Sequence, residues 1–109
     1  MIREINSEEF KDMLEHSEKP MLVSFIAEKY STCRMMAPIL SQVANEYKDR
    51  FDISQIDVEK NPDIALEYRV LSVPTMLIFR DGRLLGKIEG VATKAAVDSK
   101  LSKYFDIQK

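Results

Sequence analysis

The stretch from Met21 to Pro38, which reads Met-Leu-Val-Ser-Phe-Ile-Ala-Glu-Lys-Tyr-Ser-Thr-Cys-Arg-Met-Met-Ala-Pro, decides how this chain folds. Its first part, Met21 to Ala27, is an apolar run of the length and type expected of a buried strand. Its second part begins a helix, because apolar residues recur there at steps of four, three and four: Met36, Leu40, Val43 and Tyr47. Between the two lie a polar turn, Glu28 to Thr32, and the only cysteine, Cys33. Open α/β folds often place their chemistry at such a junction, since the first helical N–H groups and the positive end of the helix dipole point there.

The flanking segments alternate between strand and helix patterns. Residues 2–5 predict a short strand, and Asn6 or Ser7 can cap a helix that ends near Ser17. We next expect a helix from about Cys33 to Asp49, kinked at Pro38, and a strand from Phe51 to Val58. A short helix should follow, capped by Asn61 and beginning at Pro62. The last elements that we expect are strands from Thr75 to Arg80 and from Arg83 to Glu89, and a helix capped by Thr93.

Two features of this order indicate the fold class. The dipeptide Asp81-Gly82 is a strong hairpin signal, so the strand after it should pair antiparallel with the strand before it. The early strand–helix–strand units favour parallel pairing with crossover helices. We therefore predict an α/β fold with a central mixed β-sheet flanked by helices on both faces.

Composition narrows the class of protein. The chain has 109 residues, of which 45% are hydrophobic and 31% charged, so we expect one folded domain over residues 1–109. The net charge of -2 and the lack of a Lys/Arg cluster argue against a nucleic-acid surface. No signal core or membrane-length apolar run is visible, and a lone cysteine fits a reducing compartment, so we expect a cytoplasmic protein. The sequence leaves the oligomeric state open.

Short motifs along the chain resemble the thioredoxin family over nearly its whole length. The matching pieces, which are specific together through their order and spacing, are Phe25-x-Ala27-Glu28, Cys33-Arg34-Met35-x-Ala37-Pro38, Asp57-Val58-x-x-Asn61-Pro62, Val73-Pro74-Thr75, Phe79-x-Asp81-Gly82 and Gly90. The resemblance implies a thioredoxin fold with a cis bond before Pro74. It also implies that Val73 offers its backbone to an extended peptide, in a groove lined by Val73, Pro74, Gly90 and Val91.

The active-site motif departs from the family pattern, which is Trp-Cys-Gly-Pro-Cys-Lys. Residues 29–34 of this chain read Lys-Tyr-Ser-Thr-Cys-Arg, so the family's second cysteine remains as Cys33 and its nucleophilic first cysteine is Tyr30. Dithiol exchange needs one thiolate to attack a disulfide and a second to resolve the mixed disulfide, and a phenol does neither. The family's buried acid falls at Ser24 and the lysine usually near it falls at Gln55. Ordinary thioredoxin turnover is therefore not expected.

Two functions of different classes stay open on the sequence, of which the sequence favours the first. In the first, Cys33 forms mixed disulfides as the candidate catalytic residue of a single-cysteine thiol–disulfide protein in redox homeostasis. In the second, a redox-silent module holds extended or unfolded peptides along the groove by strand addition, with Tyr30 as a contact. The expected partners are proteins or peptides with thiols, disulfides or extended segments. His16 is the only histidine and has no second ligand nearby, so we expect no metal and no cofactor.

Overall fold

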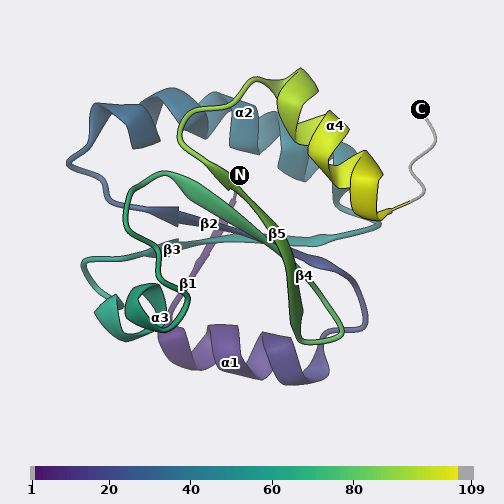
Figure 1. Cartoon of the computed structure of the whole chain (residues 1–109), viewed down its shortest axis with the longest axis horizontal. Helices are drawn as coiled ribbons and strands as arrows, with labels where there is room; N and C mark the ends of the chain where they lie inside the picture. The colour runs from purple at the N-terminus through teal and green to yellow at the C-terminus, as the bar shows by residue number, and fades with distance from the viewer. Residues whose placement is uncertain (1, 106–109) are drawn as a thin grey trace.

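The computed structural model describes residues 2–105 and arranges them as a five-stranded sheet between two layers of helices (Figure 1). The elements in chain order are β1 (Arg3–Ile5), α1 (Ser7–His16), β2 (Met21–Ile26), α2 (Ser31–Tyr47), β3 (Asp52–Asp57), α3 (Pro62–Glu67), β4 (Thr75–Arg80), β5 (Arg83–Glu89) and α4 (Lys94–Tyr104). Helices α2 and α4 cover one face of the sheet, and α1 and α3 cover the other. The predicted α/β architecture is confirmed.

The sheet has the strand order β1-β3-β2-β4-β5 and is mixed. β2 lies at its centre, parallel to β3 on one side and antiparallel to β4 on the other. All six residues of β2 are buried, as expected for a strand that helices cover on both faces. The Asp81-Gly82 turn joins β4 to β5 in the predicted antiparallel hairpin.

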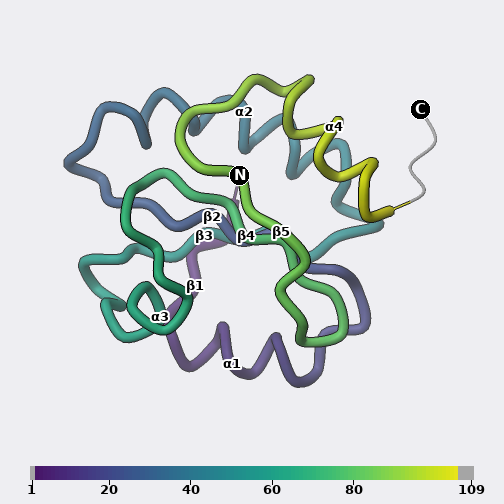
Figure 2. The backbone as a smooth tube through the Cα atoms, viewed as in Figure 1, coloured from purple at the N-terminus to yellow at the C-terminus, as the bar shows by residue number. Residues whose placement is uncertain are grey.

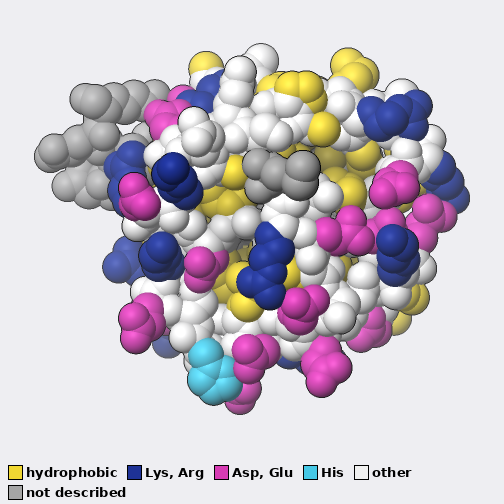
Figure 3. Space-filling model, turned by 180° about the vertical axis from the view of Figure 1, so that it is seen from behind, with side chains coloured by type: hydrophobic (Ala, Val, Ile, Leu, Met, Phe, Trp, Pro, Cys, Tyr) yellow, Lys and Arg dark blue, Asp and Glu magenta, His cyan; other side chains and the backbone are white. Residues whose placement is uncertain are grey.

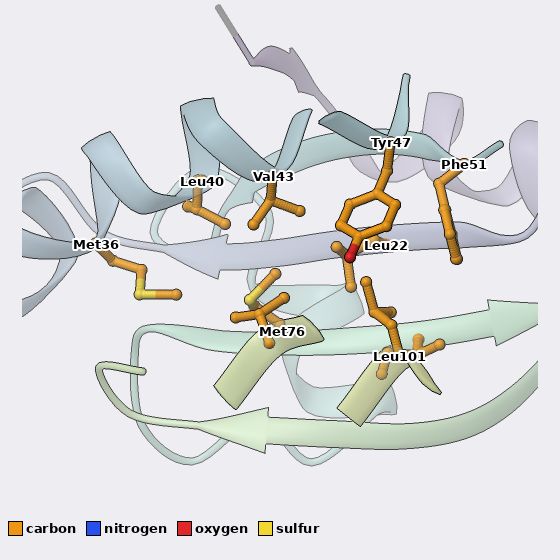
Figure 4. Close-up of a cluster of buried hydrophobic side chains, with 10 residues drawn as sticks. Leu22, Met36, Leu40, Val43, Tyr47, Phe51, Met76 and Leu101 are labelled. Carbon is orange, nitrogen blue, oxygen red and sulfur yellow. The ribbon is translucent and has the colours of Figure 1, made fainter. Parts of the chain in front are cut away.

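Each face of the sheet carries its own hydrophobic core. Under α2 and α4, the side chains that the helical periodicity picked out interdigitate with residues of β2 and β4 (Figure 4); the cluster includes Leu22, Met36, Leu40, Val43, Tyr47, Met76 and Leu101. Under α1, the fully buried Phe10 packs edge-to-face against Phe25, Tyr68 and Phe79. The first of these cores fixes α2 on the sheet, and with it the turn that precedes the helix.

Most predicted boundaries lie within two residues of the observed ones, but the role given to Asn61 needs correction. Asn61 does stand at the N-cap position of α3, with Pro62 first in the helix, yet its side chain makes no capping bond. Its amide instead accepts a hydrogen bond from the Ser7 N–H at 2.9 Å and donates one to the Asp57 carbonyl at 3.0 Å. These tertiary contacts replace the local cap. Helix α2 begins at Ser31, two residues before the predicted Cys33, and runs on through Pro38.

A polar network joins α2 to α4 at the edge of the first core. The fully buried Tyr47 donates a hydrogen bond from its hydroxyl to Asp98 at 2.6 Å, and Lys94 bonds to both Asp98 and Glu46. Burial, together with the bond to Asp98, raises the pKa of Tyr47 to about 12. The neutral phenol is therefore the form that the folded protein stabilises.

This network predicts a loss of stability in strong alkali. Because the pKa of Tyr47 is higher in the folded state than the ordinary value near 10, its contribution is fully present below about pH 10 and disappears as the pH rises through about 12. A shift of this size is worth on the order of 3 kcal/mol. Urea unfolding between pH 8 and 12 should show this decline in the wild type. Tyr47→Phe should be less stable at pH 8 and should decline less; equal declines in both proteins would contradict the assignment.

Candidate functional site

Three chain segments meet at one end of the sheet, on the left in Figures 1 and 2: the turn between β2 and α2, the loop between α3 and β4, and the loop after β5. The first turn is held by its own backbone. The Tyr30 N–H donates to the Ala27 carbonyl at 3.2 Å, and the Cys33 N–H donates to the Tyr30 carbonyl at 3.1 Å. Tyr30 is the N-cap residue of α2, but its side chain makes no capping bond. The side chain is therefore available for contacts at the surface.

The ring of Tyr30 is steadied by its neighbour. Lys29 forms an ion pair with Glu59 at 2.8 Å, and its ammonium lies 5.3 Å from the centre of the Tyr30 ring. The hydrogen bond to Glu59, followed by the charge of that carboxylate, raises the pKa of Lys29, so the lysine is cationic at neutral pH. Tyr30 itself is 47% exposed. An aromatic ring that is exposed and held in place is suited to contact a partner at low entropic cost.

The loop before β4 carries the Val73–Pro74 bond, which is cis, as the resemblance implied. The Pro74 carbonyl accepts a hydrogen bond from the Gly90 N–H at 2.8 Å, with Gly90 in the left-handed region at a φ of +81°. The Thr32 hydroxyl donates to the Val73 carbonyl at 3.3 Å. These two bonds tie the loop to the start of α2 and to the loop that follows β5.

A hollow of about 340 Å³ opens between the Tyr30 turn and this loop. We call this hollow the groove. The residues that line it are Tyr30, Val58, Val70, Leu71, Ser72 and Val73. Among residues 2–105, no charged side chain lines the groove, and Leu71 is 92% exposed. An apolar groove with a projecting leucine favours an uncharged, apolar segment as its occupant.

Cys33 lies apart from the groove. The residue is 6% exposed, and its sulfur accepts a hydrogen bond from the Ala27 N–H at 3.4 Å. It lines a second hollow, of about 400 Å³, together with Ile26, Glu28, Arg34, Ala37, Leu40 and Gln55. Arg34 directs its guanidinium to the Glu28 carbonyl at 2.8 Å. The thiol and the groove therefore line two different hollows, which share no lining residue.

The sheet beneath Cys33 offers no titratable group at the position of the family's acid. Ser24 is 1% exposed, and among residues 2–105 its hydroxyl has no hydrogen-bond partner. Gln55 lies beside it in β3 as its register partner. A serine hydroxyl keeps its proton near neutral pH, so this pair cannot take up or release a proton during thiol chemistry.

The structure brings some of the predicted site residues together and separates others. Tyr30 and Val73 both line the groove, whereas Pro74 is buried and does not line it, and its carbonyl accepts a hydrogen bond from Gly90. Val91 is 43% exposed but does not line the groove. Sequence reasoning missed the groove residues Val58, Val70, Leu71 and Ser72, although the apolar pair Val70-Leu71 between a short helix and Val73-Pro74 was a usable signal.

Comparison with known proteins identifies the family. The Thioredoxin family model matches residues 1–103. The chain belongs to the thioredoxin family. It is 32% identical to a thioredoxin of Porphyra purpurea, with 94% of this chain and 96% of the relative covered. It is also 32% identical to the chloroplastic M-type thioredoxin of Chlamydomonas reinhardtii, with 94% and 73% covered.

A solved structure supports the same conclusion for the fold. This chain superimposes on one chain of a solved structure with a TM-score of 0.83 at 29% identity, and the match covers 94% of both chains. That structure was reported as the structural basis of the thiol resolving mechanism in yeast mitochondrial 1-Cys peroxiredoxin via glutathione/thioredoxin systems. Some other thioredoxin relatives are longer: this chain spans 20% of a bifunctional thioredoxin reductase/thioredoxin of Mycobacterium leprae and 48% of the chloroplastic thioredoxin Y2 of Arabidopsis thaliana.

As a thioredoxin-like protein with a single cysteine, this chain has an incomplete motif. Among residues 2–105, no three His, Cys, Asp or Glu side chains gather where they could hold a metal ion. The same residues contain no helix that is long and apolar enough to cross a membrane. On the face drawn in Figure 3, Lys and Arg side chains are interspersed with Asp and Glu rather than gathered into one basic region.

Proposed function

We propose that this thioredoxin-family protein binds extended segments of partner proteins in the groove, without dithiol–disulfide exchange. The observation that carries the proposal is the identity of the residue at the rim of the groove. A thioredoxin needs its attacking thiol there, whereas this chain has the exposed ring of Tyr30. The remaining thiol, on Cys33, is buried and lines another hollow.

The groove has the parts needed for strand addition, in which an extended segment pairs with exposed backbone and places alternate side chains in pockets. Val73 is half-buried at the wall of the groove, and among the described residues its N–H makes no intramolecular hydrogen bond. Tyr30 and Leu71 supply the apolar contact area beside it. The thioredoxin family acts on proteins with thiols and disulfides; here we expect the segment itself, rather than a disulfide within it, to be recognised.

Groove substitutions test this function. We expect Leu71→Ala and Tyr30→Ala each to weaken binding of a permanently unfolded protein, reduced and carboxymethylated α-lactalbumin, by about tenfold, because each removes a large side chain that binding would bury. Fluorescence anisotropy with the labelled protein measures the affinity. Leu66→Ala is the matched control, since Leu66 is 80% exposed but does not line the groove, and it should bind like the wild type. Equal effects at Leu66 and Leu71 would rule out the groove as the site.

A second candidate function is single-thiol chemistry at Cys33, and one observation favours it. The hollow of about 400 Å³ beside the thiol has the volume for a small molecule, and the cationic side chain of Arg34 lines it. In that case the Cys33 thiolate would attack a low-molecular-weight disulfide, form a mixed disulfide with one half and expel the other half as a thiolate, and a second, external thiol would release Cys33 by the same exchange. Recovery of such an adduct on Cys33 after incubation with oxidised glutathione, at a rate above that of the unfolded chain, would favour this reading.

Other expectations remain predictions. The cytoplasmic location is one of them, since several relatives are chloroplastic thioredoxins. A single domain over residues 1–109 and a role in redox homeostasis are others. We do not expect nucleic acid or membranes among the partners.

A further inference from the structure

The backbone carbonyls beside the groove already accept hydrogen bonds from other groups of the protein. Three consecutive carbonyls of the loop before β4 each accept an intramolecular hydrogen bond. The Ser72 carbonyl accepts from the Thr75 hydroxyl at 2.7 Å, the Val73 carbonyl from the Thr32 hydroxyl at 3.3 Å, and the Pro74 carbonyl from the Gly90 N–H at 2.8 Å. Pro74 has no N–H, so Val73 is the residue at which an added strand would both donate and accept.

Of these three bonds, the one from Thr32 is the easiest to displace. It is the longest, and it joins two segments that lie 41 residues apart in the chain. The donor stands on an exposed residue in the first turn of α2, whereas Thr75 is 2% exposed and Gly90 donates through its backbone. Its length of 3.3 Å exceeds the usual range of about 2.5–3.0 Å for O–H···O hydrogen bonds, so the bond is weak.

We propose that Thr32 is a specificity-determining residue that regulates access to the groove: in the free protein its hydroxyl donates to the Val73 carbonyl, and an extended partner segment that pairs there as a strand competes with it. This inference rests on the proposed function. Segments with a backbone N–H opposite Val73 can displace the hydroxyl. Segments with proline at that position have no N–H to offer and leave the hydroxyl in place.

The size of the effect follows from the competition of two donors, the Thr32 hydroxyl and an N–H of the segment, for one acceptor, the Val73 carbonyl. A carbonyl oxygen has two lone pairs, so the hydroxyl weakens pairing at Val73 rather than abolishing it. In the wild type, binding of a segment gives up the bond from Thr32 in exchange for a bond from the segment. Without the hydroxyl nothing is given up, so the binding free energy should improve by about the net value of one exposed hydrogen bond. Removal of the competing hydroxyl should therefore strengthen binding by about 2- to 10-fold.

Thr32→Val tests the inference, because valine keeps the shape of threonine and removes the hydroxyl. We expect this variant to bind labelled, carboxymethylated α-lactalbumin about 2- to 10-fold more tightly than the wild type, while Thr32→Ser, which keeps the hydroxyl, binds like the wild type. An NMR measurement of the Val73 carbonyl carbon separates this role from a general effect on the fold. Its resonance should shift in Thr32→Val and not in Thr32→Ser.

The outcomes separate the inference from the proposed function. If the wild type binds with the expected dependence on Leu71 but Thr32→Val binds equally or more weakly, the inference is wrong and the groove function stands. If neither protein binds the unfolded probe, both are wrong. If Thr32→Val unfolds, Thr32→Ala takes its place with the same expected gain in affinity, checked against the same carbonyl resonance.

Discussion

The purified protein is expected to leave the rate of insulin reduction by dithiothreitol at its uncatalysed value. In that assay a thioredoxin attacks the insulin disulfide with one thiolate and is released by its second thiol. Here Tyr30 stands at the attacking position, 47% exposed at the rim of the groove, and a phenol forms no mixed disulfide. Robust turnover that disappears in Cys33→Ser would show that the buried thiol can perform the reaction alone.

Restoring the family's first cysteine should not restore the rate at which a thioredoxin reduces insulin. Tyr30→Cys recreates the spacing of two thiols around the start of α2, but Ser24 still lacks an acidic proton and Gln55 still lacks a charge. Proton transfer by a positioned acid or base is worth about 10²–10⁴-fold in rate. We therefore expect Tyr30→Cys to reduce insulin at least about 10²-fold more slowly than an authentic thioredoxin in the same assay.

Two further variants complete this test. Tyr30→Ser, which opens the same space without a thiol, should remain inactive. Addition of Ser24→Asp to Tyr30→Cys should raise the rate, because it supplies the missing acid next to Gln55, which lines the same hollow as Cys33. A rate equal to that of thioredoxin from Tyr30→Cys alone would show that the acid is unnecessary in this chain.

The sequence was sufficient for the fold because its strongest patterns are also the ones that the tertiary structure uses. The apolar run from Met21 became the central strand β2, and the side chains spaced along α2 became one of the two cores. The Asp81-Gly82 turn produced the expected hairpin, and Thr93 capped the last helix. Local propensity and burial pointed to the same structure at each of these positions.

The site was only partly predictable, because its geometry depends on segments that are distant in the chain. Tyr30 and Val73 were identified from the family motifs, but the groove wall at Leu71 and the bond from Thr32 to Val73 require the loop before β4 to approach the start of α2. Asn61 stands at the predicted N-cap position, but its side-chain partner could not be predicted for the same reason, since its amide bonds to Ser7, 54 residues away, rather than to its own helix. Periodicity carries no information on such contacts.

Cys33 is expected to react slowly in the native protein and quickly in denaturant. Attack on a reagent requires the sulfur to reach it, and Cys33, in the first turn of α2, is only 6% exposed. Reaction must then wait for a local opening, and an opening that costs about 3 kcal/mol lowers the rate about 10²-fold. The natural control is an exposed thiol on the same helix. Met35→Cys in a Cys33→Ser background should react in the native state as fast as in denaturant, because Met35 is 62% exposed.

The labelling rate of Cys33 with a bulky aromatic disulfide reagent, measured against pH in the native and unfolded protein, tests the central claim that this family member binds partners without thiol chemistry. We predict a native rate about 10²-fold or more below the unfolded rate from pH 7 to 9. A native rate that equals or exceeds the unfolded rate near neutral pH would contradict the account and make Cys33 a working nucleophile.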